Sequence, residues 1–408
     1  EEKLDWAKCN ACPSCGACSF IGTASTMQIM AEALGLALPG SALMPATSPD
    51  LLAYAREAGR QAVKLAQMEH MRPSDFVTKE SFENAILVHA AISGSTNCLL
   101  HIPAIAHEFG HVNQIRPGLK WVSTTEVTNN VYSVCARYKF YRENMPLEHE
   151  RCNDGNDNNV RGGRFNSYLN YGIIKGEQWL CQKGQDNMDP SKYPYGGDHF
   201  VKLCPLWQLL LYYREIVGGE KRDWYGDVAE IVRNTDESQL TNGQLQLNFM
   251  RNTMDVVKED LTDFFIKAGM LKPIDKELDD YARGQMTITQ TDCDELVKYA
   301  SKYSKPATPV LYYLSANSQK AFKDKLAVEG TYNEGVKVRN NGWIVIDHDV
   351  WKNAVVFETY QGDELKYAAI VGTDSPDLSE TKVCYPEGST RIEAVSWDGK
   401  RKLVYGEK

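Results

Sequence analysis

The sequence has no run of eighteen apolar residues and no apolar segment near its start. A membrane-spanning helix needs about 20 consecutive apolar residues, so we expect no transmembrane segment. The chain opens on EEKLDWAKCN, which is charged and lacks the apolar core of a signal peptide. Because this opening is unlike a natural start, we expect that a native targeting signal could simply be missing from it.

The sequence also lacks an excess of positive charge, internal repeats and low-complexity segments. Its 45 Lys and Arg residues against 54 Asp and Glu residues give a net charge of −9. This balance argues against nucleic acid as a partner, because phosphate binding requires clustered basic residues. With 43% hydrophobic and 24% charged residues, the 408-residue chain has a globular composition and room for two or three domains.

Cysteines are present, but most of them have no framework spacing. Seven of the eleven are scattered, and the other four are Cys9, Cys12, Cys15 and Cys18. The spacing C-x2-C-x2-C-x2-C is compatible with zinc or an iron–sulfur cluster, because thiolates two residues apart can chelate one metal. It differs from the bacterial ferredoxin spacing in its last gap. Cysteine usage therefore leaves the redox compartment open.

The strongest chemical signal is the H-E-x-x-H pattern of His107, Glu108 and His111. On a helix the two histidines are i and i+4, so both imidazoles leave the same face and can reach one zinc ion. Glu108 is placed to take a proton from a metal-bound water. A catalytic zinc needs a third protein ligand, and Glu126 is the natural candidate if a second helix beginning near Ser123 returns it to the metal.

The strings HEFGHVNQ and TEVTNNVYS, with Trp121 between them, resemble the enhancin and mucin-degrading zinc metallopeptidases. Those enzymes carry H-E-x-G-H-x-x-Q, then W, then T-E-V-T-N-N, and they are gluzincins. The resemblance covers about residues 107–408. It implies that Glu126 is a zinc ligand, that the substrate is a protein or glycoprotein such as mucin, and that the enzyme is secreted or on the cell surface. His199 is then a candidate substrate contact.

A different resemblance covers about residues 1–110. The segment CSFIGTASTM, a following EALGLALPG helix end and the GSTN turn at Gly94–Asn97 resemble the dihydroxy-acid and sugar-acid (phosphogluconate) dehydratases. Cys18 takes the position of one iron–sulfur ligand of that family, whose enzymes are cytoplasmic. The family's other cluster cysteines, its magnesium-binding acidic residues and its serine base have no match here. One cysteine cannot hold the cluster, so we expect a protein without it.

The two resemblances meet inside the string AIAHEFGH, where both families share letters. A natural gene fusion and a chimeric sequence joined through the shared stretch are the two explanations. We favour the chimera, because domain fusions normally fall in linkers rich in Pro, Gly or polar residues rather than inside a motif.

We predict an α+β architecture in three parts. Residues 1–106 form a dehydratase-like α/β fragment, residues 107–316 a mainly helical gluzincin (zincin) catalytic region, and residues 317–408 a β-sandwich-like domain. Apolar periodicity predicts helices at 51–70, 126–141 and 198–216, and residues 219–300 continue as helices between polar turns. Short β-branched and aromatic runs after Pro306 predict strands at 343–347, 354–360, 366–371, 391–397 and 402–405.

Three functions from different classes follow from these patterns. The first is a zinc peptidase that uses a Glu-activated, zinc-bound water. The second is an iron–sulfur hydro-lyase, represented only by a fragment. The third is a catalytically silent protein, either a carbohydrate-binding or a chimeric one. Residues 1–106 occupy the place of the twisted sheet whose edge strand helps gluzincins to hold a substrate, so we expect metal binding to be retained better than turnover.

Overall fold

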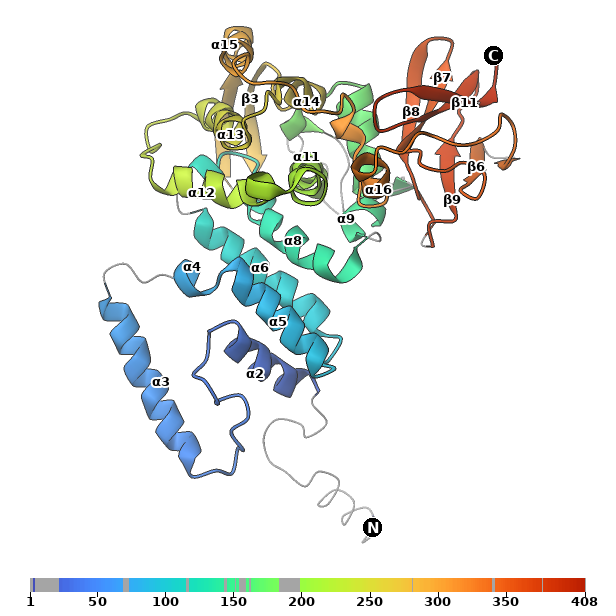
Figure 1. Ribbon diagram of the computed structural model, residues 1–408. Coiled ribbons are helices and arrows are strands. Elements are labelled where there is room, and N and C mark those ends of the chain that lie inside the picture. Colours follow the sequence, from blue (N-terminus) through green and yellow to red (C-terminus); the bar gives the residue numbers. More distant parts are fainter. Residues whose placement is uncertain are drawn as a thin grey trace. The chain divides into compact units, whose positions relative to one another are not determined.

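The structure is a computed structural model and has a mixed α+β fold (Figure 1). It divides into two compact units, Glu1–Phe109 and Gly110–Lys408. It describes Lys3 and residues 22–68, 73–114, 117–142, 145–150, 152–153, 159–160, 163–182, 199–280, 282–339, 342–375 and 377–407.

The regular secondary structure of the first unit, over the residues that the structure describes, consists of helices joined by turns. Its helices are α2 (Thr23–Ala33), α3 (Asp50–Gln67), α4 (Pro73–Phe76), α5 (Lys79–Ala91) and the start of α6 (Cys98–Asn113). The α/β prediction for this segment is therefore not met by the described residues. A parallel sheet requires repeated βαβ units with long crossovers, and a family resemblance over about 110 residues does not supply them.

Two of the three dehydratase-like strings, the end of CSFIGTASTM and the GSTN turn, are hydrogen-bonded to each other. The Ser95 backbone N–H donates to Thr26 Oγ1 at 3.1 Å, and Asn97 Nδ2 donates to Thr23 Oγ1 at 2.6 Å. The start of α2 is thus tied to the turn before α6. Helix α3 differs, because none of its side chains is buried even though its sequence is amphipathic.

The second unit is organised around α11 (His199–Leu211), in which every residue from Val201 to Leu211 is buried. Apolar residues all round a helix predict such a central position. It contacts α7, α8 and α10, and it lies among the helices of this unit in Figure 1. The α-helices of this unit are α7 (Thr125–Thr128), α8 (Asn130–Tyr141), α9 (Pro146–His149), α10 (Gly163–Ser167), α11, α12 (Trp224–Arg233), α13 (Asn242–Val257), α14 (Thr262–Lys267), α15 (Gln290–Ala300) and α16 (Gln319–Lys323).

Two of the predicted helices are present but divided. The predicted 126–141 helix is split into α7 and α8, with Glu126 outside helical backbone geometry at φ −98° and ψ 16°. The predicted 198–216 helix is α11 followed by the π-helical turn η4 (Tyr212–Val217). Further short turns are η1 (Pro117–Leu119), η2 (Tyr168–Ile174, π-helical), η3 (Trp179–Cys181), η5 (Gly219–Asp223) and η6 (Leu311–Tyr313).

The prediction of helices throughout 219–300 is wrong at one place. Strands β3 (Ile274–Asp280) and β4 (Ala282–Ile288) form an antiparallel hairpin there. Leu278, Met286 and Ile288 are buried, so the hairpin has one apolar face. The charged residues of KELDD mask that alternation in the sequence, and the face is recognisable only once α13 lies against β4. A second, very short pair is β1 (Cys152–Asn153) with β2 (Asn159–Val160).

The C-terminal part of the second unit contains two antiparallel sheets. One has the order β11-β10-β7-β8 and the other β5-β6-β9. The five predicted strands correspond to β6, β7, β8, β10 and β11, while β5 and β9 lie outside the predicted runs. The bounds are β5 Val336–Val338, β6 Trp343–Asp347, β7 Val356–Gln361, β8 Glu364–Ile370, β9 Glu380–Cys384, β10 Arg391–Val395 and β11 Arg401–Gly406.

The four-stranded sheet contributes to two apolar clusters. Phe357, Ala369 and Ile392 pack with Ile344 and Val383 of the three-stranded sheet. Other residues of the same strands or beside them join the large core of the helical part; they are Val355, Val356, Ala368, Ile370 and Val395. The sheets are therefore packed against the helices as well as against each other.

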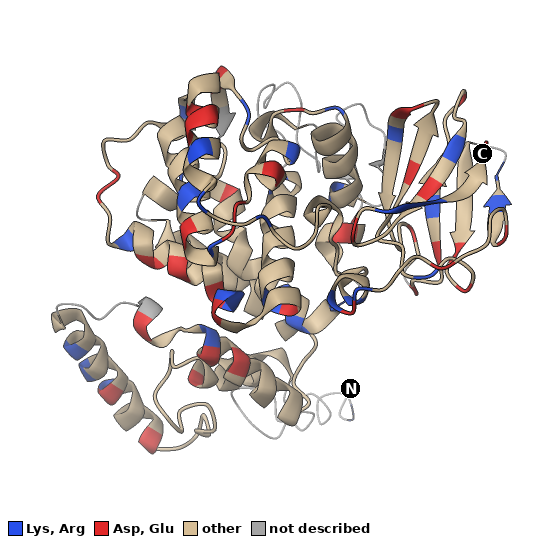
Figure 2. Cartoon of the chain, turned by 45° about the horizontal axis from the view of Figure 1, so that its top comes forward, with Lys and Arg blue, Asp and Glu red and all other residues tan. Residues whose placement is uncertain are grey.

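Positively and negatively charged residues are interspersed along the helices and strands (Figure 2). Among the described helices, none combines the length and the apolar character that crossing a membrane requires.

Candidate metal centre

Helix α6 carries both histidines of the H-E-x-x-H pattern. It is continuous from Cys98 to Asn113, so His107 and His111 lie one turn apart on one face. Gly110, between them, faces the start of α8. A Cβ at this position would be 2.3 Å from the Asn129 carbonyl oxygen, so only glycine allows α6 to come this close. The glycine of the motif thus brings the histidines to the segment that carries Glu126.

Glu126 is held by a buried loop that precedes α7. Trp121 is 2% exposed, and its indole N–H donates to Gln246 Oε1 at 3.0 Å. Ser123 has a left-handed backbone with φ 70°, which is unfavourable for a residue with a Cβ. The fully buried Lys202 of α11 donates from Nζ to the Ser123 carbonyl at 3.2 Å and to its hydroxyl. Contacts with α11 and α13 therefore fix the loop that presents Glu126.

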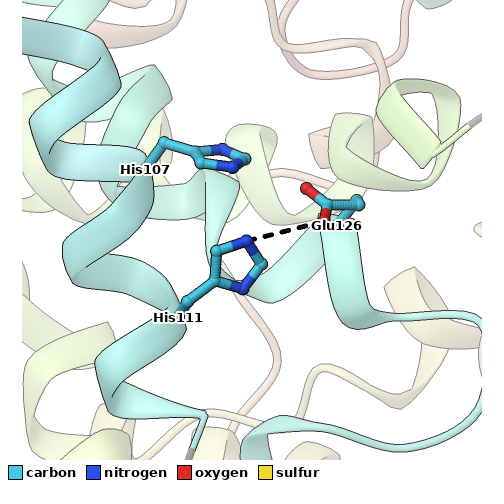
Figure 3. Close-up of side chains that lie close together, drawn as sticks. All are labelled: His107, His111 and Glu126. Atoms are coloured by element: carbon cyan, nitrogen blue, oxygen red, sulfur yellow. Dashed lines mark ion pairs between the residues drawn. The ribbon is translucent and has the colours of Figure 1, made fainter. Parts of the chain in front are cut away.

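His107, His111 and Glu126 come together as the sequence predicts (Figure 3). One ligand atom from each lies within 4.8 Å of the others, and His111 Nε2 is 3.5 Å from Glu126 Oε1. Two atoms bound tetrahedrally to one zinc at about 2.0–2.1 Å are roughly 3.3–3.4 Å apart. All three residues are half-buried. Two imidazoles and one carboxylate are a donor set that zinc prefers, so these residues fit a zinc ion.

Gln114 decides which nitrogen of His111 is available to a metal. Its Nε2 donates to the Thr125 carbonyl at 2.9 Å and to Thr128 Oγ1 at 2.6 Å. A carbonyl can only accept, so the amide N–H groups must face α7 and Gln114 Oε1 must face His111. His111 Nδ1 lies 2.9 Å from that oxygen and is therefore the protonated nitrogen. His111 Nε2 then carries the lone pair, and it lies on the side of Glu126.

The other predicted site residues have different positions. Glu108 is on α6 and is exposed, so its carboxylate is accessible to a substrate and to water. His199 is the half-buried first residue of α11 and is not a member of the three-residue cluster. Cys18 lies outside the described residues, and with it the iron–sulfur prediction. Within the part of the chain that the structure describes, the His–His–Glu cluster is the one group with metal-binding geometry.

Three residues at the site were not singled out from the sequence, namely Gln114, Asn129 and Asn130. All three are at most 6% exposed. They lie within the strings HEFGHVNQ and TEVTNN, at helical spacings of three or four residues from His111 or Glu126. Residues at that spacing share a helix face, and this was the signal that could have identified them.

Comparison with known families finds the same two families as the sequence motifs, with different bounds. Residues 1–136 match the family model described as dihydroxy-acid/6-phosphogluconate dehydratase N-terminal. Residues 102–269 match the family model described as peptidase M60, enhancin and enhancin-like. The two matches overlap across α6, α7 and the beginning of α8, which includes the string shared by both families.

Curated dehydratases match the N-terminal part of the chain. The dihydroxy-acid dehydratase of Moorella thermoacetica is 49% identical over 110 residues, which are 27% of this chain and 20% of the relative. A D-xylonate dehydratase of Escherichia coli is 50% identical over 105 residues, which are 26% of this chain and 16% of the relative. The chain thus spans about a fifth of the length of these relatives.

Two solved structures of metallopeptidases are also similar to this chain. A metallopeptidase from Bacteroides thetaiotaomicron is 19% identical with a TM-score of 0.49, covering 81% of this chain and 51% of that protein. A metallopeptidase in complex with Tn antigen is 20% identical with a TM-score of 0.48, covering 73% of this chain and 53% of that protein. By the two family-model matches, the chain joins a segment similar to the dehydratase family, residues 1–136, to a segment similar to the M60 peptidase family, residues 102–269.

Proposed function

We propose that this chain is a zinc-dependent peptidase that hydrolyses peptide bonds of glycosylated, mucin-like proteins. The observation that carries the proposal is the convergence of His107, His111 and Glu126 within 4.8 Å in a segment that matches the M60 family. The hydrogen bond from His111 Nδ1 to Gln114 leaves Nε2 as the nitrogen that can bind a metal. The glycoprotein substrate class rests on the sequence resemblance to mucin-degrading enzymes.

The proposed chemistry assigns one role to each side chain. His107, His111 and Glu126 would hold the zinc ion. When bound, zinc supplies Lewis acidity, which polarises the scissile carbonyl and lowers the pKa of a bound water to about 7. The Glu108 carboxylate would accept a proton from the water whose oxygen attacks the scissile carbonyl carbon. It would deliver that proton to the leaving amine nitrogen when the C–N bond breaks. His199 is proposed as a hydrogen-bond donor to the substrate.

A dehydratase activity is not part of the proposal. The match to those enzymes spans about a fifth of their length, and their cluster requires more cysteines than the Cys18 position alone. The choice between a natural fusion and a chimeric sequence stays a prediction.

The experiment measures zinc content and peptidase turnover separately. After dialysis, wild type should retain one zinc per chain, and so should Glu108→Gln, because that change removes the base but no ligand. Turnover on an O-glycosylated mucin substrate should fall about 10²–10⁴-fold in Glu108→Gln. His107→Ala, His111→Ala and Glu126→Ala should lose the zinc. Mass spectrometry of the metal and a peptide-release assay provide the two readouts.

His101→Ala is the matched control. His101 is exposed on the same helix and lies outside the cluster, so its loss should change neither zinc content nor turnover. Wild-type protein that holds no zinc, or ligand variants that retain it as well as His101→Ala does, would exclude the proposed metal centre. Retained zinc without any turnover would instead exclude the peptidase activity.

A further inference from the structure

Asn129 and Asn130 follow Glu126 and are almost completely buried, at 0% and 4% exposed. Asn130 Nδ2 donates to the Glu126 carbonyl oxygen at 2.8 Å and to Asn129 Oδ1 at 3.2 Å. A backbone carbonyl accepts and cannot donate, so the Asn130 amide must present its N–H groups here. The oxygen of Asn129 must then face Asn130. The orientation of the Asn129 amide is therefore determined by its neighbour.

The nitrogen of Asn129 points the other way, towards two of the three cluster residues. Asn129 Nδ2 is 3.0 Å from His111 Nε2 and 3.4 Å from Glu126 Oε2. It can donate to both, because His111 Nδ1 is the protonated nitrogen and Nε2 carries a lone pair. The backbone of Asn129 is held against Gly110, so this amide is anchored at both of its ends.

We infer that Asn129 is a positioning residue of the metal centre, and that Asn130 sets its orientation. The inference rests on the proposed zinc site. Without metal, the Asn129 amide donates to two acceptors in a half-buried place, where an acceptor left without a hydrogen bond would be unfavourable. Once the lone pair of His111 Nε2 is used for metal binding, the same amide still holds Glu126 Oε2. That leaves Glu126 Oε1, 3.5 Å from His111 Nε2, to face the metal.

The assignment explains the order of residues after the third ligand. Asn129 is three positions after Glu126 and Asn130 four, so both side chains return to the same turn. A hydrogen bond to one oxygen of a carboxylate also fixes the direction of the other oxygen. The side chain then has less rotational freedom to lose when it binds a metal. Residues that hold a ligand in this way typically account for 10–100-fold of metal affinity.

The test measures zinc affinity by competition with a chelator, and ligand geometry from the visible absorption spectrum of the cobalt(II)-substituted protein. Asn129→Ala and Asn130→Ala should each weaken zinc binding, Asn129→Ala by about 10–100-fold. Both should change the cobalt spectrum, which a merely structural role would leave unchanged in folded protein. The double variant should bind zinc about as weakly as Asn129→Ala, because Asn130 acts through Asn129. Asn234→Ala, which changes an exposed asparagine at the end of α12, should behave as wild type.

Thermal unfolding of the metal-free proteins shows which variants are folded. If Asn129→Ala does not fold, Asn130→Ala carries the test, because it keeps Asn129 and removes only the group that orients it. Folded variants with wild-type zinc affinity and an unchanged cobalt spectrum would overturn the inference while leaving the zinc site intact. A wild-type protein without zinc affinity would overturn the proposed function and this inference with it.

Discussion

Gly110 on α6 lies against the backbone of Asn129, and a Cβ added to it would be 2.3 Å from the Asn129 carbonyl oxygen and 2.6 Å from its Cα. The obstacle is backbone on both sides, so no flexible side chain can move aside. This contact sets the distance between the helix that carries the two histidines and the segment that carries Glu126.

We therefore expect Gly110→Ala to destabilise the second unit by about 1–3 kcal/mol and to reduce zinc binding, because α6 must move away from Asn129. Gly226→Ala is the control, since a Cβ at that exposed position of α12 meets nothing within 4 Å. It should be neutral or stabilise the protein by up to about 1 kcal/mol, because alanine favours helix. Urea unfolding and zinc titration measure both effects. Equal behaviour of the two variants would contradict the close contact.

Glu148 of α9 should make stability depend on pH. Its side chain is fully buried and accepts bonds from the Trp207 indole at 2.8 Å and the Ala316 backbone N–H at 2.7 Å. Burial raises the pKa of its carboxyl from 4.5 to about 7. A raised pKa means that the folded state binds the proton more tightly than the unfolded state. The stabilisation is therefore fully present below about pH 4.5 and is lost as pH rises through 7.

Glu148→Gln removes that titration while keeping an oxygen acceptor for the two donors. Relative to wild type, the variant should gain stability between pH 5 and pH 8, by an amount on the order of 3 kcal/mol at most. Urea unfolding at several pH values measures this difference. Glu220→Gln, at an exposed position in η5, should show no comparable gain. A stability difference that stays constant with pH in Glu148→Gln would refute the assignment.

The C-terminal sheets allow a test of the predicted boundary between residues 316 and 317. A fragment of residues 317–408 contains all strands of both sheets and should give a β-rich circular dichroism spectrum. It should unfold at lower urea than the second unit, residues 110–408, because residues such as Val355, Ile370 and Val395 lose the helical core against which they pack. A disordered fragment would show that the strands need the helices, and that the boundary is placed wrongly.

The sequence by itself determined the features that depend on local periodicity and on motif strings. The i, i+4 spacing of His107 and His111 predicted their shared face, because helical backbone geometry repeats every 3.6 residues. Short runs of β-branched and aromatic residues predicted five strands of the C-terminal part, because such residues favour the extended backbone of a strand. Glu126 was the candidate third ligand from its place after the motif and from the family resemblance, and it lies beside the histidines in the structure.

Only the tertiary structure decided the orientation of the polar groups around that cluster. The β3–β4 hairpin escaped prediction because its apolar face becomes evident only against α13. Gln114 determines which ring nitrogen of His111 carries the lone pair, and Asn130 determines the direction of the Asn129 amide. The side-chain amide of Asn or Gln can adopt two orientations that exchange its oxygen and its nitrogen. The neighbouring donors and acceptors determine which orientation it takes. In this protein they belong to α6, α7 and α8, which are in contact only in the folded structure.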